Sequence, residues 1–412
     1  MPKLLVIGYV WPEPKSSAAG TRMMQLLKFF QNENYQITFA TTARETDNKA
    51  DLNELGIQSE KIKLNDADFD VFLEDLMPHI VLFDRFMVEE QFGWRVDTVC
   101  PEAIKILDTE DLHFLRKARH QSFKENKKAE EIYFDSDLAK REIAAIYRCD
   151  LSLIISEIEL KLLTSKFQVP ESILQYLPFL LKEISEKEQL NLPVFEDRKD
   201  FISIGNFLHE PNWNAVLYLK EKIWPQIRKA LPEAKMQVYG AYPSQKVLNL
   251  LNSKENFIIN GWAESSREVM RDSRVCLAPI QFGAGLKGKL VEAMQNGTAS
   301  VTTKIGAEGI NGQLAWNGFI TESDNEFIEK SIELYTNDQL WEKQLKLGFD
   351  IINKRFNKQE HIENFRKKLS LIQNDLERHR LTNFTGKMLK HHLHKSTYFM
   401  SRFIEEKNKK FL

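Results

Sequence analysis

One stretch of the 412-residue sequence combines glycines, lysines and an acid at a spacing that suits an anion. It reads FGAGLKGKLVEAMQNG, from Phe282 to Gly297, and follows a segment with the composition of a buried strand. Glycine lets a backbone bend tightly and lets a ligand approach closely. Backbone N–H groups at a helix start attract negative charge. Because Lys287 and Lys289 lie beside such N–H groups, the stretch predicts a phosphate-binding loop leading into a helix that carries Glu292.

Gly283, Gly285 and Gly288 also spell G-x-G-x-x-G, the spacing of a dinucleotide-binding fingerprint. The strand that follows, TASVTTK (298–304), ends without the acid that would bind a ribose 2′-hydroxyl, and the loop comes late in its domain. A P-loop fits less well, because no Ser or Thr follows the lysine and the spacing differs. These departures make a nicotinamide or flavin site the weaker interpretation, and the lysines favour another phosphate ligand.

The overall composition excludes several classes of protein. Hydrophobic residues make up 42% and charged residues 28%, which are globular values, and the formal net charge of −2 offers no basic field for nucleic acid. The length predicts two domains, since single cores seldom grow beyond about 250–300 residues. Three cysteines far apart form neither a metal cluster nor a disulfide framework, which favours a reducing cytoplasm. No apolar run reaches the roughly 20 residues that span a bilayer.

Two successive alternations of strands and helices must position the candidate loop. The predicted buried strands of the first alternation are 3–9, 35–42, 79–84, 103–111 and 150–156. Those of the second are 201–206, 235–240, 256–261, 274–280, 298–303 and 318–321. We therefore predict an α/β protein of two Rossmann-like open parallel domains facing each other across a cleft. Ligands of such sheets bind at the carboxyl ends of the strands.

Changes of composition divide the chain into four parts. They are a first domain (1–178), a linker of prolines and charges (179–199), a second domain (200–372) and a tail (373–412). Between residues 376 and 412 the tail has nine Lys/Arg against three Glu, a net charge of +6. Its apolar residues recur at helical spacing, at Leu389, Leu393, Met400 and Phe403. Such a basic amphipathic helix suits an anionic lipid surface; the alternatives are a solvated helix or one packed against the protein or a second subunit.

The wider context of the glycine stretch resembles a known family. GWAESSREVMRDSRVCLAPIQFGAGLKGKLVEAMQNGTASVTTKIGAEGI (261–310) is similar to the carboxyl domain of retaining GT-B glycosyltransferases of family 4. The shared features are an "A-P" strand, an F-G-x-G-x-K-x-K-x-x-E-A-M segment and a V-T-T-x-x-G-x-E-G segment. SIGNFLHEPNWNAV (203–216), AAGTRMMQLLKFF (18–30) and LDTEDLHFLR (107–116) resemble further segments of the family. The resemblance touches both domains and leaves the tail outside.

The resemblance implies transfer of a sugar, with retention, from a nucleoside-diphosphate sugar bound by the second domain to a glycan or lipid-linked acceptor on the first. The residues it implies around the donor are Gly20, Arg22, Asn206, Gly261, Trp262, Gly283, Ala284, Gly285, Lys287 and Glu292. Lys287 would stabilise the departing diphosphate, and Glu292 would accept hydrogen bonds from ribose hydroxyls. The backbone at Gly261 and Trp262 would meet the base. Helix-surface ion pairs remain the alternative for Glu292 and Lys289.

The sequence departs from the family in its donor loop. The usual pair of glutamates is spaced E-x7-E, and counting back eight from Glu292 gives Ala284. Sugar recognition therefore stays open, with the backbone N–H groups of Ala284 and Gly285 as candidates. A basic residue that the family often has early in the second domain is not evident, and His209 is the nearest candidate.

On the first domain, Asp111 and His113 follow a strand end and are expected to face the acceptor. His113 joins Lys287 and Glu292 as a catalytic candidate, although a lone histidine is also commonly structural. Gly20 would let its loop approach the donor phosphate or the acceptor. Arg22 would pair with a phosphate or cap the cleft side of its helix.

No DxD-type motif occurs where it could hold a donor diphosphate, so we predict that lysine and helix dipole replace a metal and that no cofactor is needed. The predicted protein is a glycosyltransferase of surface polysaccharide or glycoconjugate synthesis, cytoplasmic or at the inner face of the membrane. One alternative is a nucleotide-sugar epimerase of similar two-domain shape, which needs several acid/base groups at one cleft. Another is a non-catalytic nucleotide- or glycan-binding subunit, an alternative that Ala284 keeps open.

Overall fold

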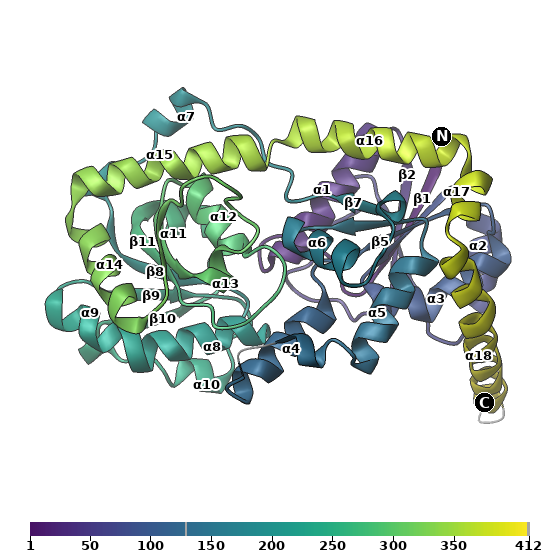
Figure 1. Cartoon of the computed structure of the whole chain (residues 1–412), viewed down its shortest axis with the longest axis horizontal. Helices are drawn as coiled ribbons and strands as arrows, with labels where there is room; N and C mark the ends of the chain where they lie inside the picture. Colours follow the sequence, from purple (N-terminus) through teal and green to yellow (C-terminus); the bar gives the residue numbers. More distant parts are fainter. Residues whose placement is uncertain (128–129, 410–412) are drawn as a thin grey trace.

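Two open parallel sheets form the frame of the protein in a computed structural model, which describes residues 1–127 and 130–409 (Figure 1). The strands of the first sheet, in the order β3-β2-β1-β4-β5-β6-β7, are β1 (Lys3–Gly8), β2 (Gln36–Thr41), β3 (Gln58–Lys61), β4 (Ile80–Asp84), β5 (Ile104–Asp108), β6 (Leu151–Ile154) and β7 (Leu174–Tyr176). Those of the second, in the order β10-β9-β8-β11-β12-β13, are β8 (Lys199–Ile204), β9 (Met236–Tyr239), β10 (Phe257–Gly261), β11 (Ser273–Ala278), β12 (Ala299–Thr303) and β13 (Gly318–Thr321). All paired strands of both sheets are parallel.

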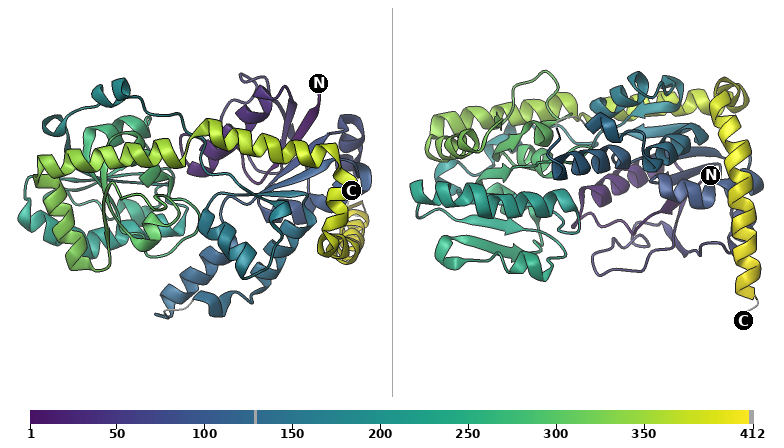
Figure 2. Two further views of the ribbon diagram at one scale, coloured as in Figure 1. Left: turned by 45° about the horizontal axis from the view of Figure 1, so that its top comes forward. Right: turned by 60° about the horizontal axis from the view of Figure 1, so that its bottom comes forward.

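Helices cover both faces of each sheet (Figure 2). Around the first sheet they are α1 (Ala18–Asn32), α2 (Asp68–Leu76), α3 (Phe86–Val99), α4 (His113–Lys124), α5 (Asp137–Arg148) and α6 (Glu157–Ser165). Around the second they are α8 (Glu210–Tyr218), α9 (Trp224–Ala230), α10 (Gln245–Leu248), α11 (Ser266–Asp272), α12 (Gly288–Gln295), α13 (Lys304–Ala307), α14 (Asp324–Thr336) and α15 (Asp338–Arg355). The predicted pair of Rossmann-like α/β domains is confirmed.

Two short strands, β3 and β7, were absent from the prediction. β3 reads QSEK and β7 reads LQY, and both lie at the edges of the first sheet. Edge strands of three or four residues need not carry a buried apolar run, since only one neighbour pairs with them. The sequence pattern therefore contained little signal for either strand.

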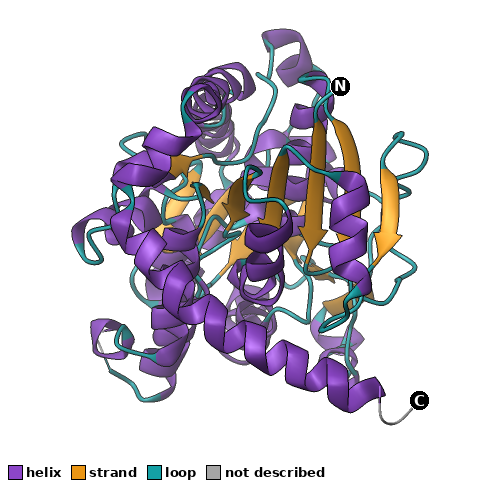
Figure 3. Ribbon diagram, turned by 90° about the vertical axis from the view of Figure 1, so that its right-hand side faces the viewer, coloured by secondary structure: helices purple, strands orange, loops and turns teal. Residues whose placement is uncertain are grey.

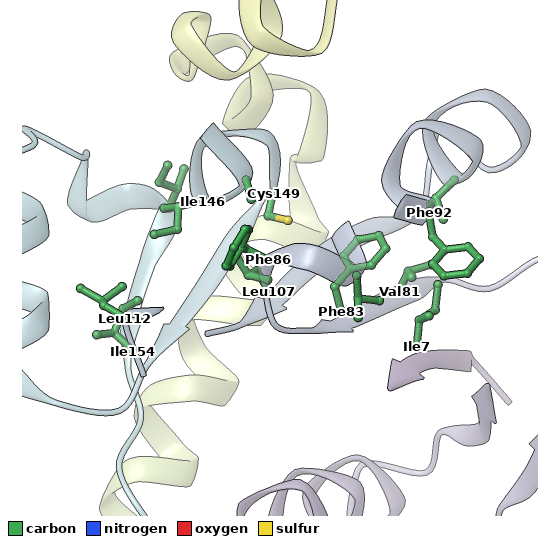
Figure 4. Close-up of a cluster of buried hydrophobic side chains, with 14 of the residues drawn as sticks. Ile7, Val81, Phe83, Phe86, Phe92, Leu107, Leu112, Ile146, Cys149 and Ile154 are labelled. Carbon is green, nitrogen blue, oxygen red and sulfur yellow. The ribbon is translucent and has the colours of Figure 1, made fainter. Parts of the chain in front are cut away.

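The apolar core of the first domain holds the ends of its central strands in place. Successive side chains of β1 enter opposite faces of the sheet: Leu5 and Ile7 belong to one buried cluster, and Leu4 and Val6 belong to another. Figure 4 shows the first of these clusters, with Ile7, Val81, Phe83 and Leu107 from neighbouring strands. The apolar runs of the central strands end where the strands leave this core. Polar residues follow at the carboxyl ends of the strands, which lie along one side of the sheet.

The chain crosses between the domains twice, and the two crossings lie side by side. The N–H of Leu181 donates to the carbonyl of Phe356 (3.0 Å), and the N–H of Lys358 donates to the carbonyl of Leu181 (2.9 Å). Leu180 and Leu181 are buried, and the predicted linker also contains the short helix α7 (Glu186–Leu190). The linker is thus partly packed and paired with the return crossing.

After the second crossing, α16 (Lys358–Asn374) lies on the first domain (Figure 1). The ring of Phe365 lies 4.7 Å from that of Phe29 and 6.1 Å from that of Phe30, between centroids. Its other buried residues, Ile362, Leu369 and Ile372, belong to the same first-domain cluster. The sequence division placed the second domain's end at residue 372, whereas packing assigns residues from 358 onward to the first domain.

The tail forms α17 (Leu376–Thr382) and α18 (Phe384–Lys409), which lie on the side of the first domain that faces away from the second domain (Figure 1) and toward the viewer in Figure 3. Ion pairs join it to the domain: Arg380 to Asp150 (2.8 Å), Lys390 to Asp97 (3.5 Å) and Arg95 to Glu405. Exposed along the tail are Leu381, Phe384, Met388, Phe399, Met400 and Phe403. The tail thus docks through charges and presents apolar side chains to solvent.

Leu389 is half-buried, and the side chain of Leu393 lies outside the described residues. In the part of the chain that is described, no helix is long and apolar enough to cross a membrane.

Candidate active site

A cleft of about 1050 Å³ separates the two domains at the carboxyl ends of both sheets. The loops after β1, β4 and β5 line it from the first domain, and the stretch between Ile280 and Gln295 lines it from the second. This is the place at which open parallel sheets bind ligands.

The glycines of the loop before α12 (residues 282–288, here the glycine loop) allow the two domains to meet. Gly285 has a φ of +63°, and a Cβ added there would lie 2.8 Å from the Cβ of Asp111. A Cβ on Gly288 would lie 2.6 Å from the Cβ of Ala18. Both distances are shorter than real Cβ contacts, so larger residues at these positions would push the domains apart. The glycines thus serve the contact between domains as well as any approach of a ligand.

Two lysines line the cleft beside this loop. The ammonium of Lys287, which precedes α12, donates to the carbonyl of Gly285 (3.0 Å), and that of Lys289 donates to Oδ1 of Asn212 (2.8 Å). Burial lowers the pKa of each lysine to about 8. Among the residues that the structure describes, no carboxylate forms an ion pair with either ammonium. The two lysines are half-buried, and charges withdrawn from water are normally paired, so this corner of the cleft is suited to an anion.

Glu292 faces the same part of the cleft from the next turn of α12. One carboxylate oxygen accepts a hydrogen bond from the hydroxyl of Ser266, at the start of α11, and burial raises the pKa of Glu292. The structure thus places Glu292 in the cleft and not in a helix-surface ion pair. Its carboxylate keeps the capacity to accept further hydrogen bonds from hydroxyl groups.

Asp111 and His113 form the opposing wall. Arg116 donates to both carboxylate oxygens of Asp111, and Nε2 of His113 lies 3.6 Å from one of them. Burial alone would raise the pKa of Asp111, but Arg116, His113 and His209 together lower it to about 2. Burial lowers the pKa of His113 to about 4, so its ring is neutral at neutral pH.

The start of α4 holds His113 in this position. Glu142, fully buried on α5, accepts hydrogen bonds from the N–H groups of His113 (3.0 Å) and Phe114 (2.8 Å). These are two of the orphan N–H groups of a helix N-terminus. The backbone at His113 is therefore held by a carboxylate that lies 29 residues farther along the chain.

Arg22 differs from the prediction. It lies one turn into α1 with its side chain buried inside the first domain, where Nη2 lies 2.8 Å from Asp108 and Nη1 donates to the carbonyl of Leu177 (2.6 Å). It is not among the residues that line the cleft. In this structure, Arg22 joins strand ends together and does not reach a donor phosphate.

The remaining predicted residues divide into two groups. Gly20, Asn206, Trp262, Gly283 and Ala284 line the cleft, as does His209, whose pKa burial lowers to about 4. Gly261 does not line it, although it ends β10 directly before Trp262, whose ring N–H donates to the carbonyl of Lys15 (3.2 Å).

Several contacts across the cleft were not predicted. One carboxylate oxygen of Glu159 accepts from the N–H groups of Leu112 (3.1 Å) and Gly285 (2.8 Å), so the N–H of Gly285 already has a partner. Arg119 donates to the carbonyl of Gly283 (2.8 Å) and to both oxygens of Glu308 (2.7 and 2.9 Å). Of the side chains in these contacts, only that of Glu308 lies in a segment singled out from sequence, GAEG (306–309). These contacts hold the glycine loop against the first domain.

No group of three or more His, Cys, Asp and Glu side chains in the described ranges is arranged to hold a metal ion.

Residues 198–337 match the family model of glycosyl transferases group 1. No curated protein matches the sequence. The structure resembles that of TarM from S. aureus in complex with fondaparinux, alpha-GlcNAc-glycerol and UDP, with a TM-score of 0.68 and 10% identity over 89% of this chain and 99% of that chain. It also resembles sucrose-phosphate synthase from Thermosynechococcus elongatus, with a TM-score of 0.68 and 12% identity over 91% of this chain and 100% of that chain. Anabaena HepE in complex with UDP and glucose is similar with a TM-score of 0.62 and 12% identity, over 90% of this chain and 100% of that chain. The chain therefore has the two-domain GT-B fold and carries a group 1 glycosyltransferase domain.

Proposed function

We propose that this chain transfers a sugar, in the cleft between its two domains, from a nucleoside-diphosphate sugar to a hydroxyl of a glycan or lipid-linked acceptor. The observation that carries this proposal is the pair of half-buried lysines in the cleft, Lys287 and Lys289, without an ion-pair partner in the described chain. A donor diphosphate supplies the missing negative charge. Glu292, one turn along α12, suits the ribose hydroxyls of the same nucleotide.

Transfer requires that the bond between the sugar C1 and the diphosphate oxygen breaks and that a bond from C1 to the acceptor oxygen forms. The negative charge that develops on the diphosphate lies at the N-terminus of α12, where the N–H groups and Lys287 stabilise it. In a retaining reaction the acceptor attacks from the face that the diphosphate leaves. The departing phosphate oxygen then takes the hydroxyl proton, so no protein nucleophile is needed. We propose that this chemistry proceeds without a metal ion.

The ligands bound by the structural neighbours guide the choice of probes. TarM was solved with UDP and a GlcNAc-glycerol, and HepE was solved with UDP and glucose. WaaG, at 11% identity and a TM-score of 0.59, is described as a glycosyltransferase of lipopolysaccharide biosynthesis. UDP is therefore the first nucleotide to test, and surface polysaccharide or glycoconjugate synthesis is the proposed context.

The nucleotide prediction is tested by thermal unfolding of the full chain with UDP, GDP, ADP, CMP or NAD, each in EDTA. At a concentration near 100 times its Kd, one nucleoside diphosphate should add about 2.7 kcal/mol and raise the Tm of the domain that binds it by roughly 5–11 °C. Stabilisation by NAD alone would instead favour the dinucleotide interpretation of the glycines. No stabilisation by any nucleotide would contradict the proposed function, and a shift that appears only when Mg²⁺ replaces EDTA would contradict metal independence.

We further propose that the protein works at the cytoplasmic face of a membrane, with the exposed apolar side of α18 against lipid. Phe399 and Phe403 are 68% and 67% exposed, and basic residues flank them on the tail. We expect the chain to float with vesicles of phosphatidylglycerol, and to float less when Phe399 and Phe403 are both changed to Ser. Leu190→Ser, which removes an even more exposed (85%) apolar residue on α7, is the control. Equal flotation of the double variant and the wild type would contradict this placement.

A further inference from the structure

The wall of the cleft on the first domain contains three polar residues that the proposed reaction does not yet use. They are Tyr9 after β1, Arg85 after β4 and Glu110 after β5, and all three line the cleft. Arg85 has φ 73° and ψ 154°, a backbone conformation that is essentially restricted to glycine, and Glu110 has φ 62°. An arginine and a glutamate are thus kept at positions where the backbone favours glycine.

Both charged side chains retain unused hydrogen-bonding capacity. The guanidinium of Arg85 lies 3.8 Å from Asp84 and 4.9 Å from the ring centroid of Tyr9, and the carboxyl group of Glu110 lies 4.0 Å from Nε of Arg22. Within the described residues, neither the guanidinium nor the carboxyl group forms a hydrogen bond to a protein atom. Only 16% and 17% of the two side chains are exposed. Buried polar groups are almost always hydrogen-bonded, so a ligand that both donates and accepts suits them.

The charges of this wall are already balanced. Arg22 pairs with Asp108, Arg116 pairs with Asp111, and Arg85 lies beside Asp84. Burial, followed by the charge of Asp108, raises the pKa of Glu110 to about 8, so its carboxyl group is largely protonated at neutral pH. The formal charges of the wall therefore balance, and the donors of Arg85 and the carboxyl group of Glu110 remain available to hydroxyl groups.

Tyr9 adds an apolar surface to the same wall. It is 43% exposed and lies beside Arg85. Aromatic rings next to hydrogen-bonding side chains are suited to ligands that have both an apolar face and polar groups. A sugar ring has both.

We propose that Tyr9, Arg85 and Glu110 form the acceptor subsite and that this subsite selects an uncharged saccharide over one that carries a phosphate. The inference rests on the proposed function and names the chemical class of its acceptor. The strained backbone aims both charged side chains at one ligand. A phosphate in this subsite would lie beside the carboxyl groups of Glu110 and Asp84, whereas a neutral hydroxyl group can donate to a carboxyl oxygen and accept from Arg85.

The test uses the full chain with the nucleoside diphosphate that stabilises it, and saturation-transfer NMR of added sugars. The probes are the methyl glycosides of glucose, galactose and N-acetylglucosamine, each compared with its 6-phosphate. We expect at least one neutral glycoside to bind and its 6-phosphate to bind more weakly. Arg85→Gly and Glu110→Leu should each weaken the neutral glycoside by about 10- to 100-fold, the effect of losing a hydrogen bond to a charged or buried group.

Two controls separate loss of the subsite from loss of the fold. Glycine adopts the backbone of Arg85 without strain, so Arg85→Gly should keep the Tm and the nucleotide-induced shift. Gln168→Gly changes another residue of positive φ (52°) in the first domain, outside the cleft, and should leave glycoside binding unaltered. Equal binding of the 6-phosphates, unchanged binding in both cleft variants, or no glycoside binding while the nucleotide still stabilises the chain would overturn this inference. Absence of the nucleotide shift itself would instead overturn the proposed function.

Discussion

Replacing Lys287 with alanine should lower kcat for sugar transfer by about 10²–10³ while the KM for the donor changes little. This is the magnitude seen when one stabiliser of developing negative charge is removed from a closed site, and the pattern is that of a group that acts mainly in the transition state. Lys287 lies half-buried in the cleft at the start of α12. Its charge therefore acts in a medium of low polarity, where it is worth more than in water.

Steady-state kinetics with the stabilising nucleotide's sugar donor would measure this effect. Lys304→Ala is a matched control, because Lys304 lies on the same domain but is exposed and pairs with Glu322 at the surface. A kcat that stays within about twofold of the wild type would remove Lys287 from the mechanism.

The same lysine predicts a pH dependence of nucleotide binding. Burial lowers the pKa of Lys287 to about 8 in the free protein, so its ammonium form is lost as the pH rises through 8. The free nucleoside diphosphate carries the full charge that the departing group develops, so it depends on the ammonium form of Lys287 more than the sugar donor does, and its affinity should fall above pH 8. Lys287→Arg keeps the charge at all these pH values, so calorimetric titrations should show a flatter profile. An equally steep fall in this variant would assign the titration to another group, such as Lys289.

Replacing Arg22 with methionine should lower the free energy of unfolding of the first domain by about 3–5 kcal/mol, and its Tm by roughly 10 °C. Arg22 is 1% exposed, and two of its nitrogens lie within hydrogen-bond distance of Asp108. Without the guanidinium, Asp108 would remain as an uncompensated buried charge. The carbonyl of Leu177 would also lose its donor.

A second substitution separates a structural role of Arg22 from a role in the cleft. Removing both charges, in Arg22→Met with Asp108→Leu, should recover most of the stability, because well-packed apolar pairs often match buried ion pairs. Thermal unfolding with and without the stabilising nucleotide measures both properties. An unchanged Tm together with a weaker nucleotide affinity in Arg22→Met would contradict the structure and support a phosphate contact.

The two sheets could be predicted from sequence because their strands are local apolar runs separated by helical periodicity. The part of the protein against which a helix packs could not be predicted. The pattern of α16 shows an apolar face, but nothing local states that Phe365 meets Phe29 and Phe30 more than 330 residues earlier. Likewise, the tail was recognised as amphipathic, whereas its docking through Arg380 and Asp150 depends on a tertiary ion pair.

The candidate site was predictable where a motif fixes a side chain's direction. Lys287 and Glu292 lie at set positions around a helix start, and the structure places both in the cleft. Arg22 lies at a helix position from which either direction was open, and its partner Asp108 is 86 residues away. The clamp of Arg119 on Glu308 joins two domains, so it follows from how they face each other and from no segment alone.

The two neighbouring crossings at Leu181 and Phe356–Lys358 fix how the domains can open. Two adjacent connections act as a hinge: they permit rotation about one axis and resist twisting or sliding. The loop at Gly285 and Gly288 touches Asp111 and Ala18 on the opposing domain. A modest rotation about the hinge would separate these contacts together, so that the donor can enter and the product can leave by a single movement.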